Sequence, residues 1–181
     1  MAKGKNTAVV RLLYSSMFLA LGLLLPFLTA QIPYVGAALC PMHFAVLLCG
    51  FICGPTWGMV VGAVTPVLRS VVFGMPVLMP NAVVMAFELA TYAFVAGMFY
   101  KKCKKNLFYT LLALITAMVA GRLVWGAVMF ALIFLGNASG EVGFALIWNA
   151  TVLQSVPGII LQLIAIPAII TVLRKNRLML N

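Results

Sequence analysis

Three charged side chains stand within long apolar stretches of this sequence: Arg69, Glu88 and Arg122. A charge inside a bilayer is energetically costly, so it normally faces a bundle interior or a wet cavity and has a partner there. Two guanidinium groups against one carboxylate leave an excess of positive charge. A salt bridge from Glu88 to one arginine would hold two helices in register. The other arginine would then be a seat for an anionic ligand group, such as a carboxylate.

Polar and aromatic side chains accompany these charges towards one end of the apolar segments. A concave site with apolar walls and a few converging polar groups is typical of small-molecule binding. Each of these side chains has a structural explanation when taken alone. Trp148 could anchor its helix at the membrane interface, and His43 could cap its helix. As a set, we expect them to line a substrate-binding pocket with the three charges: His43, Asn81, Tyr92, Trp125, Trp148, Asn149 and Gln154.

The carboxylates and histidine are too few for metal-dependent catalysis. The chain contains no Asp, two Glu (Glu88 and Glu141) and one His, whereas most such sites need two carboxylates or a His cluster. It lacks the G-x-x-x-x-G-K-[ST] phosphate loop, so active transport must take its energy from another protein. We expect no catalytic residue, no metal, no cofactor and no enzymatic activity. The cysteines form no C-x-x-C pair and are expected to be small packing residues: Cys40, Cys49, Cys53 and Cys103.

The remainder of the sequence has the composition of a membrane protein. It has 181 residues, of which 65% are hydrophobic and 8% charged, and its mean hydropathy is +1.19. A soluble domain carries roughly 25% charged residues. We therefore expect a single transmembrane substrate-binding domain over residues 1–181, in the cell membrane. The net charge of +10 does not indicate nucleic-acid binding, because it lies next to the apolar segments, where contact with anionic lipid of the bilayer explains it.

The basic residues predict how often the chain crosses the membrane. Cytoplasmic loops collect Lys and Arg, so clusters of these residues should lie on one side. The chain must then cross an even number of times between successive clusters. Residues 43–74 could form one crossing or two, and only two crossings, with a turn near Gly54-Pro55, satisfy this rule. Ten of the twelve Lys and Arg residues form three clusters: Lys3/Lys5/Arg11, Lys101/Lys102/Lys104/Lys105 and Arg174/Lys175/Arg177.

The sequence therefore predicts an all-α bundle of six transmembrane helices with both termini in the cytoplasm. The second helix is too short to span a bilayer alone, since its twelve residues would be roughly 18 Å long. It must be tilted, flanked by loop residues or buried by its neighbours. The expected helices cover residues 9–29, 43–54, 56–74, 81–100, 107–135 and 144–173.

Small residues recur at a spacing of four in two places. One run consists of Gly50, Gly54, Gly58 and Gly62. This spacing lets helix backbones approach closely in lipid, so we expect it to pack the second and third helices together. The same run would also fit one continuous helix through Pro55, which is the odd-numbered alternative. The pair Ser16-x-x-x-Ala20 on the first helix could dock another membrane protein or serve internal packing.

Several stretches between residues 15 and 126 form a recognisable pattern. They are Gln31-Ile-Pro, Cys40-Pro-Met-His43, Leu47-Leu-Cys-Gly50-Phe-Ile-Cys-Gly54-Pro with Gly58, Thr65-Pro-Val-Leu-Arg69-Ser with Phe73-Gly-Met-Pro76, Phe87-Glu88-Leu-Ala-Thr-Tyr92 and Gly121-Arg122. This pattern resembles the substrate-binding S component of energy-coupling factor (ECF) vitamin transporters. The motifs identify the family better than they identify its cargo.

The resemblance implies a six-helix membrane protein that binds a vitamin or vitamin precursor near the outer face. The pocket would be built mainly from the last three helices and the outer loops, and residues 30–42 would be a lid. The partners would be a membrane coupling protein and two cytoplasmic ATPases. In the family the docking face includes an A-x-x-x-A pair on the first helix, and this chain has Ser16 and Ala20 in that pattern.

We therefore expect a vitamin-binding transport subunit whose cargo is anionic. Two other classes of protein agree less well with the sequence. A membrane transferase is disfavoured by the lack of Asp and by the single intramembrane Glu. A stand-alone facilitator or channel would need a continuous polar path, whereas the cytoplasmic halves of the segments are nearly all apolar.

Overall fold

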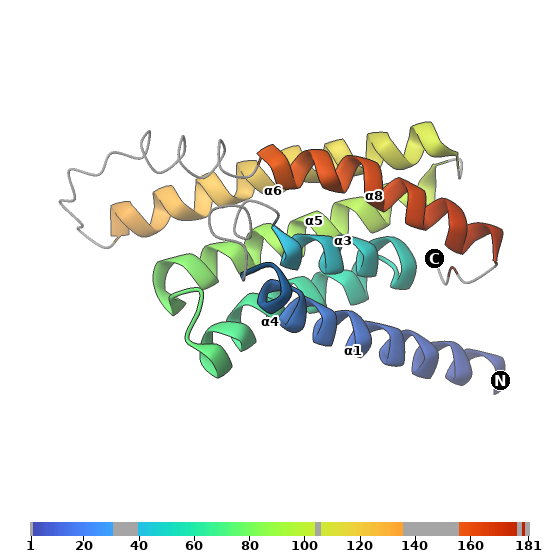
Figure 1. The fold of residues 1–181 in the computed structure, drawn as a ribbon, viewed down its shortest axis with the longest axis horizontal. Helices are drawn as coiled ribbons and strands as arrows, with labels where there is room; N and C mark the ends of the chain where they lie inside the picture. Colours follow the sequence, from blue (N-terminus) through green and yellow to red (C-terminus); the bar gives the residue numbers. More distant parts are fainter. Residues whose placement is uncertain (1, 31–39, 104–105, 136–155, 177–178, 180–181) are drawn as a thin grey trace.

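The computed structural model describes residues 2–30, 40–103, 106–135, 156–176 and 179. Within these residues every regular element is helical, and the helices lie side by side in a bundle (Figure 1). The helices in the described ranges are α1 (Ala2–Ala30), α3 (Pro41–Cys53), α4 (Pro55–Phe73), α5 (Val83–Lys102), α6 (Leu107–Leu135) and α8 (Val156–Lys175). A short kinked segment, η1 (Leu78–Ala82), leads into α5, and within it Met79 has extended backbone angles of φ −116° and ψ 131°.

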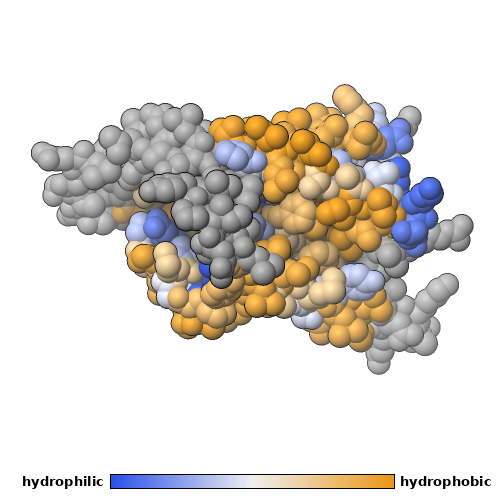
Figure 2. All heavy atoms as spheres, viewed as in Figure 1, coloured by the Kyte–Doolittle hydropathy of each residue, from blue (hydrophilic) through white to orange (hydrophobic). Residues whose placement is uncertain are grey.

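Within the described part of the chain, five helical stretches are long and apolar enough to cross a membrane, and large apolar side chains cover their outer faces. Leu13, Val71 and Leu123 are between 62% and 70% exposed. Figure 2 shows hydrophobic surface along the sides of the bundle. Such a surface suits lipid rather than water, which confirms the predicted all-α, multi-pass membrane protein. The stretches are Ala8–Phe27, Pro55–Phe73, Leu78–Lys102, Leu107–Leu132 and Val156–Lys175.

The short helix α3 lies at the centre of the bundle. Eleven of its thirteen residues are buried, and it packs against α1, α4, α5 and α8. A helix that is apolar all round is stable only when other elements surround it. Of the three explanations that its length allowed, burial by its neighbours is the one that the structure supports.

The break between α3 and α4 falls at Gly54, which has φ 101° and ψ 170°. Only glycine adopts this conformation without strain. Pro55 then begins α4, where its fixed φ suits the first turn of a helix and its missing N–H leaves no donor unsatisfied. Residues 43–74 therefore form two helices, and the alternative of one continuous helix through Pro55 is wrong.

The glycine run packs α3, α4 and α5 together. A Cβ atom at Gly58 would lie 2.6 Å from the Cα of Gly50, and one at Gly62 would lie 2.6 Å from the carbonyl oxygen of Leu89 in α5. These positions tolerate no side chain without a shift of backbone. The run thus serves internal packing, as predicted, and it also brings α5 against the hairpin of α3 and α4.

The basic residues gather at one end of the bundle. Lys101 and Lys102 lie in the last turn of α5, and Arg174 and Lys175 lie in the last turn of α8. Figure 1 places these helix ends, the beginning of α1 and the junction of α3 with α4 at the same end. Figure 2 shows hydrophilic atoms there. This arrangement has the even number of passes that the charge pattern requires, and the cytoplasmic location of this end stays a prediction.

Candidate functional site

A buried carboxylate lies at the centre of the candidate site. Glu88 is on α5, six residues into the helix, and is 1% exposed. Its Oε1 accepts a hydrogen bond from the Tyr92 hydroxyl at 3.0 Å, because residues four apart share one face of a helix. The same oxygen lies 3.0 Å from Nη1 of Arg122 on α6. Glu88 therefore contacts one side chain of its own helix, α5, and one of α6.

Gly121 explains how α6 comes close enough for this ion pair. A Cβ atom at Gly121 would overlap the ring of Tyr92, so only glycine lets α6 approach α5 at this level. The next residue is Arg122, whose side chain is 15% exposed. The sequence motif Gly121-Arg122 thus combines a close helix contact with the charge that this contact brings to Glu88.

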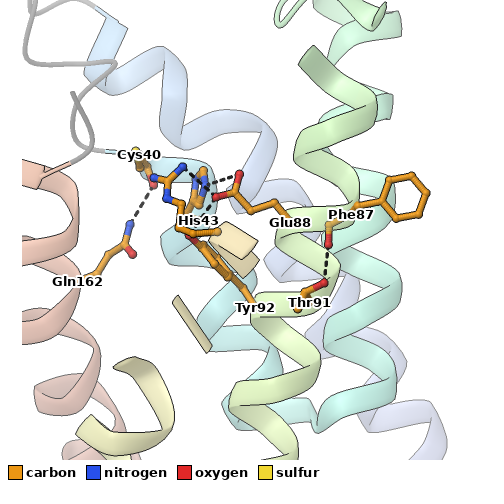
Figure 3. A network of polar contacts seen from close by, with 8 residues as sticks. Cys40, His43, Phe87, Glu88, Thr91, Tyr92 and Gln162 are labelled. Atoms are coloured by element: carbon orange, nitrogen blue, oxygen red, sulfur yellow. Dashed lines mark hydrogen bonds and ion pairs between the residues drawn. The ribbon is translucent and has the colours of Figure 1, made fainter. Parts of the chain in front are cut away.

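His43 faces the same carboxylate from α3. Its Nε2 lies 3.8 Å from Oε2 of Glu88, which is too long for a hydrogen bond, and its ring lies 5.5 Å from that of Tyr92. The residue is 6% exposed. Neither ring nitrogen has a hydrogen-bond partner among the described residues. Buried polar atoms normally have partners, and among the described residues the ring of His43 faces only the Glu88 carboxylate at this longer distance (Figure 3).

Two residues that the sequence analysis did not select complete this region. Gln162 on α8 is 3% exposed, and its Nε2 donates to the carbonyl oxygen of Cys40 at 3.4 Å (Figure 3). Cys40 precedes α3 and has a positive φ of 47°. Burial raises the pKa of the Cys40 thiol to about 11, so this group is neutral at pH 7. The signal for Gln162 was an amide within an otherwise apolar helix.

Arg69 lies outside this cluster and makes other contacts. Its Nε donates to the carbonyl oxygen of Met75 at 3.1 Å, and its Nη1 donates to that of Leu23 in α1 at 2.9 Å. Its guanidinium carbon lies 5.1 Å from the centre of the Phe27 ring. Carbonyl oxygens and an aromatic face carry no net charge, so within the described part of the chain no carboxylate offsets the positive charge of Arg69. Its role in cargo binding stays a prediction.

The remaining predicted residues fall into three groups. Asn81 is exposed in η1, and Trp125 is buried one turn beyond Arg122, where it packs with Val84. Ser16 and Ala20 are both exposed on α1. Trp148, Asn149, Gln154 and most of the predicted lid lie outside the described residues.

This cluster can offer charges and hydrogen-bonding groups to a ligand. It holds one ion pair, a phenol, an imidazole and an amide, and no group of three metal-ligating side chains occurs among the described residues. A polar cluster enclosed by apolar helices suits recognition of a small polar molecule. The fold defines a helical membrane protein, and the polar cluster inside it is suited to holding a small ligand.

A comparison with known protein families identifies the family of this chain. Residues 10–170 match the family described as ECF transporter, substrate-specific component, so this chain belongs to that family. Its members bind the substrate for transporters, and the family implies association with a coupling membrane protein and ATPases. The resemblance seen in the sequence is thereby confirmed. Neither the curated proteins nor the solved structures contain a match.

Proposed function

We propose that this protein binds a small anionic molecule, a vitamin or vitamin precursor, at the end of the bundle opposite the basic clusters. The observation that supports this most directly is the cluster around Glu88. It brings Arg122, Tyr92 and His43 to one carboxylate. The buried ring of His43 has no hydrogen-bond partner among the described residues. A cargo would supply that partner.

The balance of charge favours an acidic cargo. Glu88 offsets Arg122, and among the residues that the structure describes Arg69 contacts carbonyl oxygens and the Phe27 ring but no carboxylate. A carboxylate near this end would reduce the excess of positive charge. Arginine also suits carboxylates because its planar guanidinium can donate two parallel hydrogen bonds.

The energy for import would come from partner proteins. No phosphate-loop motif occurs in the sequence. We propose that a coupling membrane protein and two cytoplasmic ATPases drive the transport, and that the exposed pair Ser16 and Ala20 on α1 is part of the docking face.

Native mass spectrometry of the purified protein tests the binding proposal. We expect a small molecule bearing a carboxylate or another acidic group to be released from the parent protein. Much less should be released from Arg122→Ala prepared in parallel. A neutral or cationic molecule retained equally by both proteins would contradict the proposal.

A further inference from the structure

His43 lies beside an ion pair whose charges cancel. Nη1 of Arg122 lies 3.0 Å from Oε1 of Glu88, whereas Nε2 of His43 lies 3.8 Å from Oε2 of the same carboxylate. Figure 3 shows the ring of His43 beside this carboxylate. An arginine beside a carboxylate favours its ionised form. With a neutral imidazole these three side chains therefore carry no net charge, and with an imidazolium they carry one positive charge.

The contact between His43 and Glu88 can become a charged hydrogen bond without a rearrangement of the helices. At 3.8 Å it is too long for a hydrogen bond, while charge-assisted N–H···O bonds are about 2.7–2.9 Å long. A side-chain movement of about 1 Å would close this gap. Neither ring nitrogen of His43 has a hydrogen-bond partner among the described residues. A proton on the ring would therefore find an acceptor in Glu88.

The other groups next to His43 keep their charge state near neutral pH. Tyr92 of α5 has its ring 5.5 Å away, and phenols lose their proton only near pH 10. The carbonyl oxygen of Cys40 accepts from the backbone N–H of His43 at 3.1 Å, and burial raises the pKa of the Cys40 thiol to about 11. Gln162 of α8 reaches the same carbonyl oxygen with an amide that does not titrate. An imidazole, in contrast, changes its charge between about pH 5 and 8.

The charged side chains of the other helices around α3 make their recorded contacts elsewhere. Arg69 of α4 donates to carbonyl oxygens of α1 and of the segment that follows α4. Arg11 of α1 lies near Cys53, at the other end of α3 from His43. In the described part of α8 the charged residues lie in the last turn, at the basic end. The ion pair between α5 and α6 is therefore the charge that His43 meets within the described ranges.

An acid that enters this cluster changes its balance of charge. Its carboxylate adds one negative charge to groups whose charges cancel, and an uncompensated charge inside a bundle is costly. One proton on the ring of His43 restores neutrality. We propose that binding of the acidic cargo is coupled to the uptake of one proton by His43 from the surrounding water. This inference rests on the proposed function and adds the pH dependence of binding.

The proton on this ring can be observed directly, because His43 is the only histidine of the chain. Protein labelled with nitrogen-15 at histidine, and purified without a histidine tag, gives one imidazole whose NMR shifts distinguish the neutral ring from the charged one. The probes are formate, acetate and benzoate, with formamide, acetamide and benzamide as uncharged analogues of similar size. We expect a neutral ring in the free protein at about pH 8 and a charged ring when a carboxylate is bound. The amides should leave the ring neutral.

The affinity for the carboxylates should depend on pH. When one proton is taken up on binding, a lower pH favours the complex, and the affinity rises by up to about tenfold for each unit by which the pH falls. The probes themselves stay ionised above about pH 6, so they do not contribute to this change. Shifts in melting temperature over a range of probe concentrations measure the affinity between about pH 8 and about pH 6.

Two variants test the count of charges. In Glu88→Gln, Arg122 alone balances the acid, so a carboxylate should bind while the ring of His43 stays neutral. His43→Gln keeps a hydrogen-bonding group that does not titrate, so its affinity should be lower than that of the parent and independent of pH over this range. Lys102→Gln is the matched control, because it removes a charge from the exposed, basic end of α5, the helix that carries Glu88. It should behave as the parent does.

Different results would contradict the proton uptake and the anionic cargo itself. Carboxylates that raise the melting temperature while the ring of His43 stays neutral, or a ring already charged in the free protein at about pH 8, would overturn the proton uptake and leave an anionic cargo. A pH dependence that survives in His43→Gln would overturn it too, as would a ring that becomes charged in Glu88→Gln to the same extent as in the parent. If none of the three carboxylates binds at any pH, the anionic cargo is wrong.

Discussion

The ion pair between Glu88 and Arg122 joins α5 to α6 inside the bundle. A buried pair of this kind adds little net stability compared with apolar residues of the same size. Removal of one partner, however, leaves an uncompensated buried charge and is strongly destabilising. A single substitution at this pair therefore changes stability and binding together, and the two effects must be separated.

Replacement of Arg122 by Ala should lower both the stability of the protein and its affinity for the cargo. Loss of a buried charge partner costs about 2–5 kcal/mol of binding free energy, so affinity for the co-purified compound should fall roughly 30-fold or more. The melting temperature should fall as well. Isothermal titration calorimetry and thermal unfolding measure the two effects, with Arg174→Ala at the basic end as the control.

The double variant Glu88→Gln with Arg122→Met separates the contribution of the ion pair to stability from its contribution to binding. It removes both charges at similar volume, so the melting temperature should return close to that of the parent. Binding should stay weak, because the guanidinium is absent. Recovery of binding together with stability would show that the pair is purely structural.

His43→Phe should weaken binding with little effect on stability. Phenylalanine preserves an aromatic ring beside Tyr92 but removes the two nitrogens, which have no hydrogen-bond partner among the described residues. A hydrogen bond to a charged group contributes about 1.5–3 kcal/mol, so affinity should fall roughly tenfold to a hundredfold. Titration of the co-purified compound measures this change, and an affinity equal to that of the parent would exclude His43 from the site.

At the scale of the elements, close packing of α3, α4 and α5 determines where the charged cluster forms. The backbones of these helices touch at glycine positions, and α6 reaches Tyr92 through Gly121. The helices cannot be rotated independently at such contacts. Small changes at the glycines should therefore affect the whole bundle.

Gly58→Val should destabilise the protein by about 1–3 kcal/mol, the usual penalty for overpacking. The new side chain would meet the backbone of Gly50, which cannot move aside without a shift of α3. Met59→Val is the matched control, because Met59 is 39% exposed on the outer face of α4. Thermal unfolding in one detergent compares the two, and equal melting temperatures would contradict the packing account.

Ser16→Leu or Ala20→Leu should weaken assembly with the coupling protein and leave cargo binding unchanged. Both residues are exposed on α1, so a larger side chain there disturbs a partner rather than the core. Co-purification measures assembly, and calorimetry measures binding. Val71→Leu serves as the control, since Val71 is 70% exposed on α4. Intact co-purification of the two α1 variants would refute this docking face.

At the scale of the whole molecule, the apolar segments and the distribution of Lys and Arg together predicted an all-α, multi-pass membrane protein. The charge distribution required two helices between residues 43 and 74, although the first of them is too short to span a bilayer. Gly54, at φ 101°, is where the structure breaks them. Charge patterns predict topology well because membrane insertion acts on the loops and does not depend on how the helices later pack.

The composition of the site was only partly predictable. The sequence predicted Glu88, Arg122, His43 and Tyr92 as polar residues within the membrane. In the structure these four residues lie in one cluster. The sequence could not show which arginine meets Glu88, because that depends on the rotation and offset of helices that are distant in the sequence. Gln162 was not predicted as a site residue, because a single amide in an apolar helix is weak evidence for a binding site.

The most direct test of the central claim is uptake into proteoliposomes. The radiolabelled form of the co-purified acid is supplied outside vesicles that contain this protein, its coupling protein and the ATPases. We expect accumulation with internal ATP, and none beyond binding when the ATPases are inactivated by mutation. Uptake at an undiminished rate through this protein alone would contradict the account, because the chain would then be a facilitator.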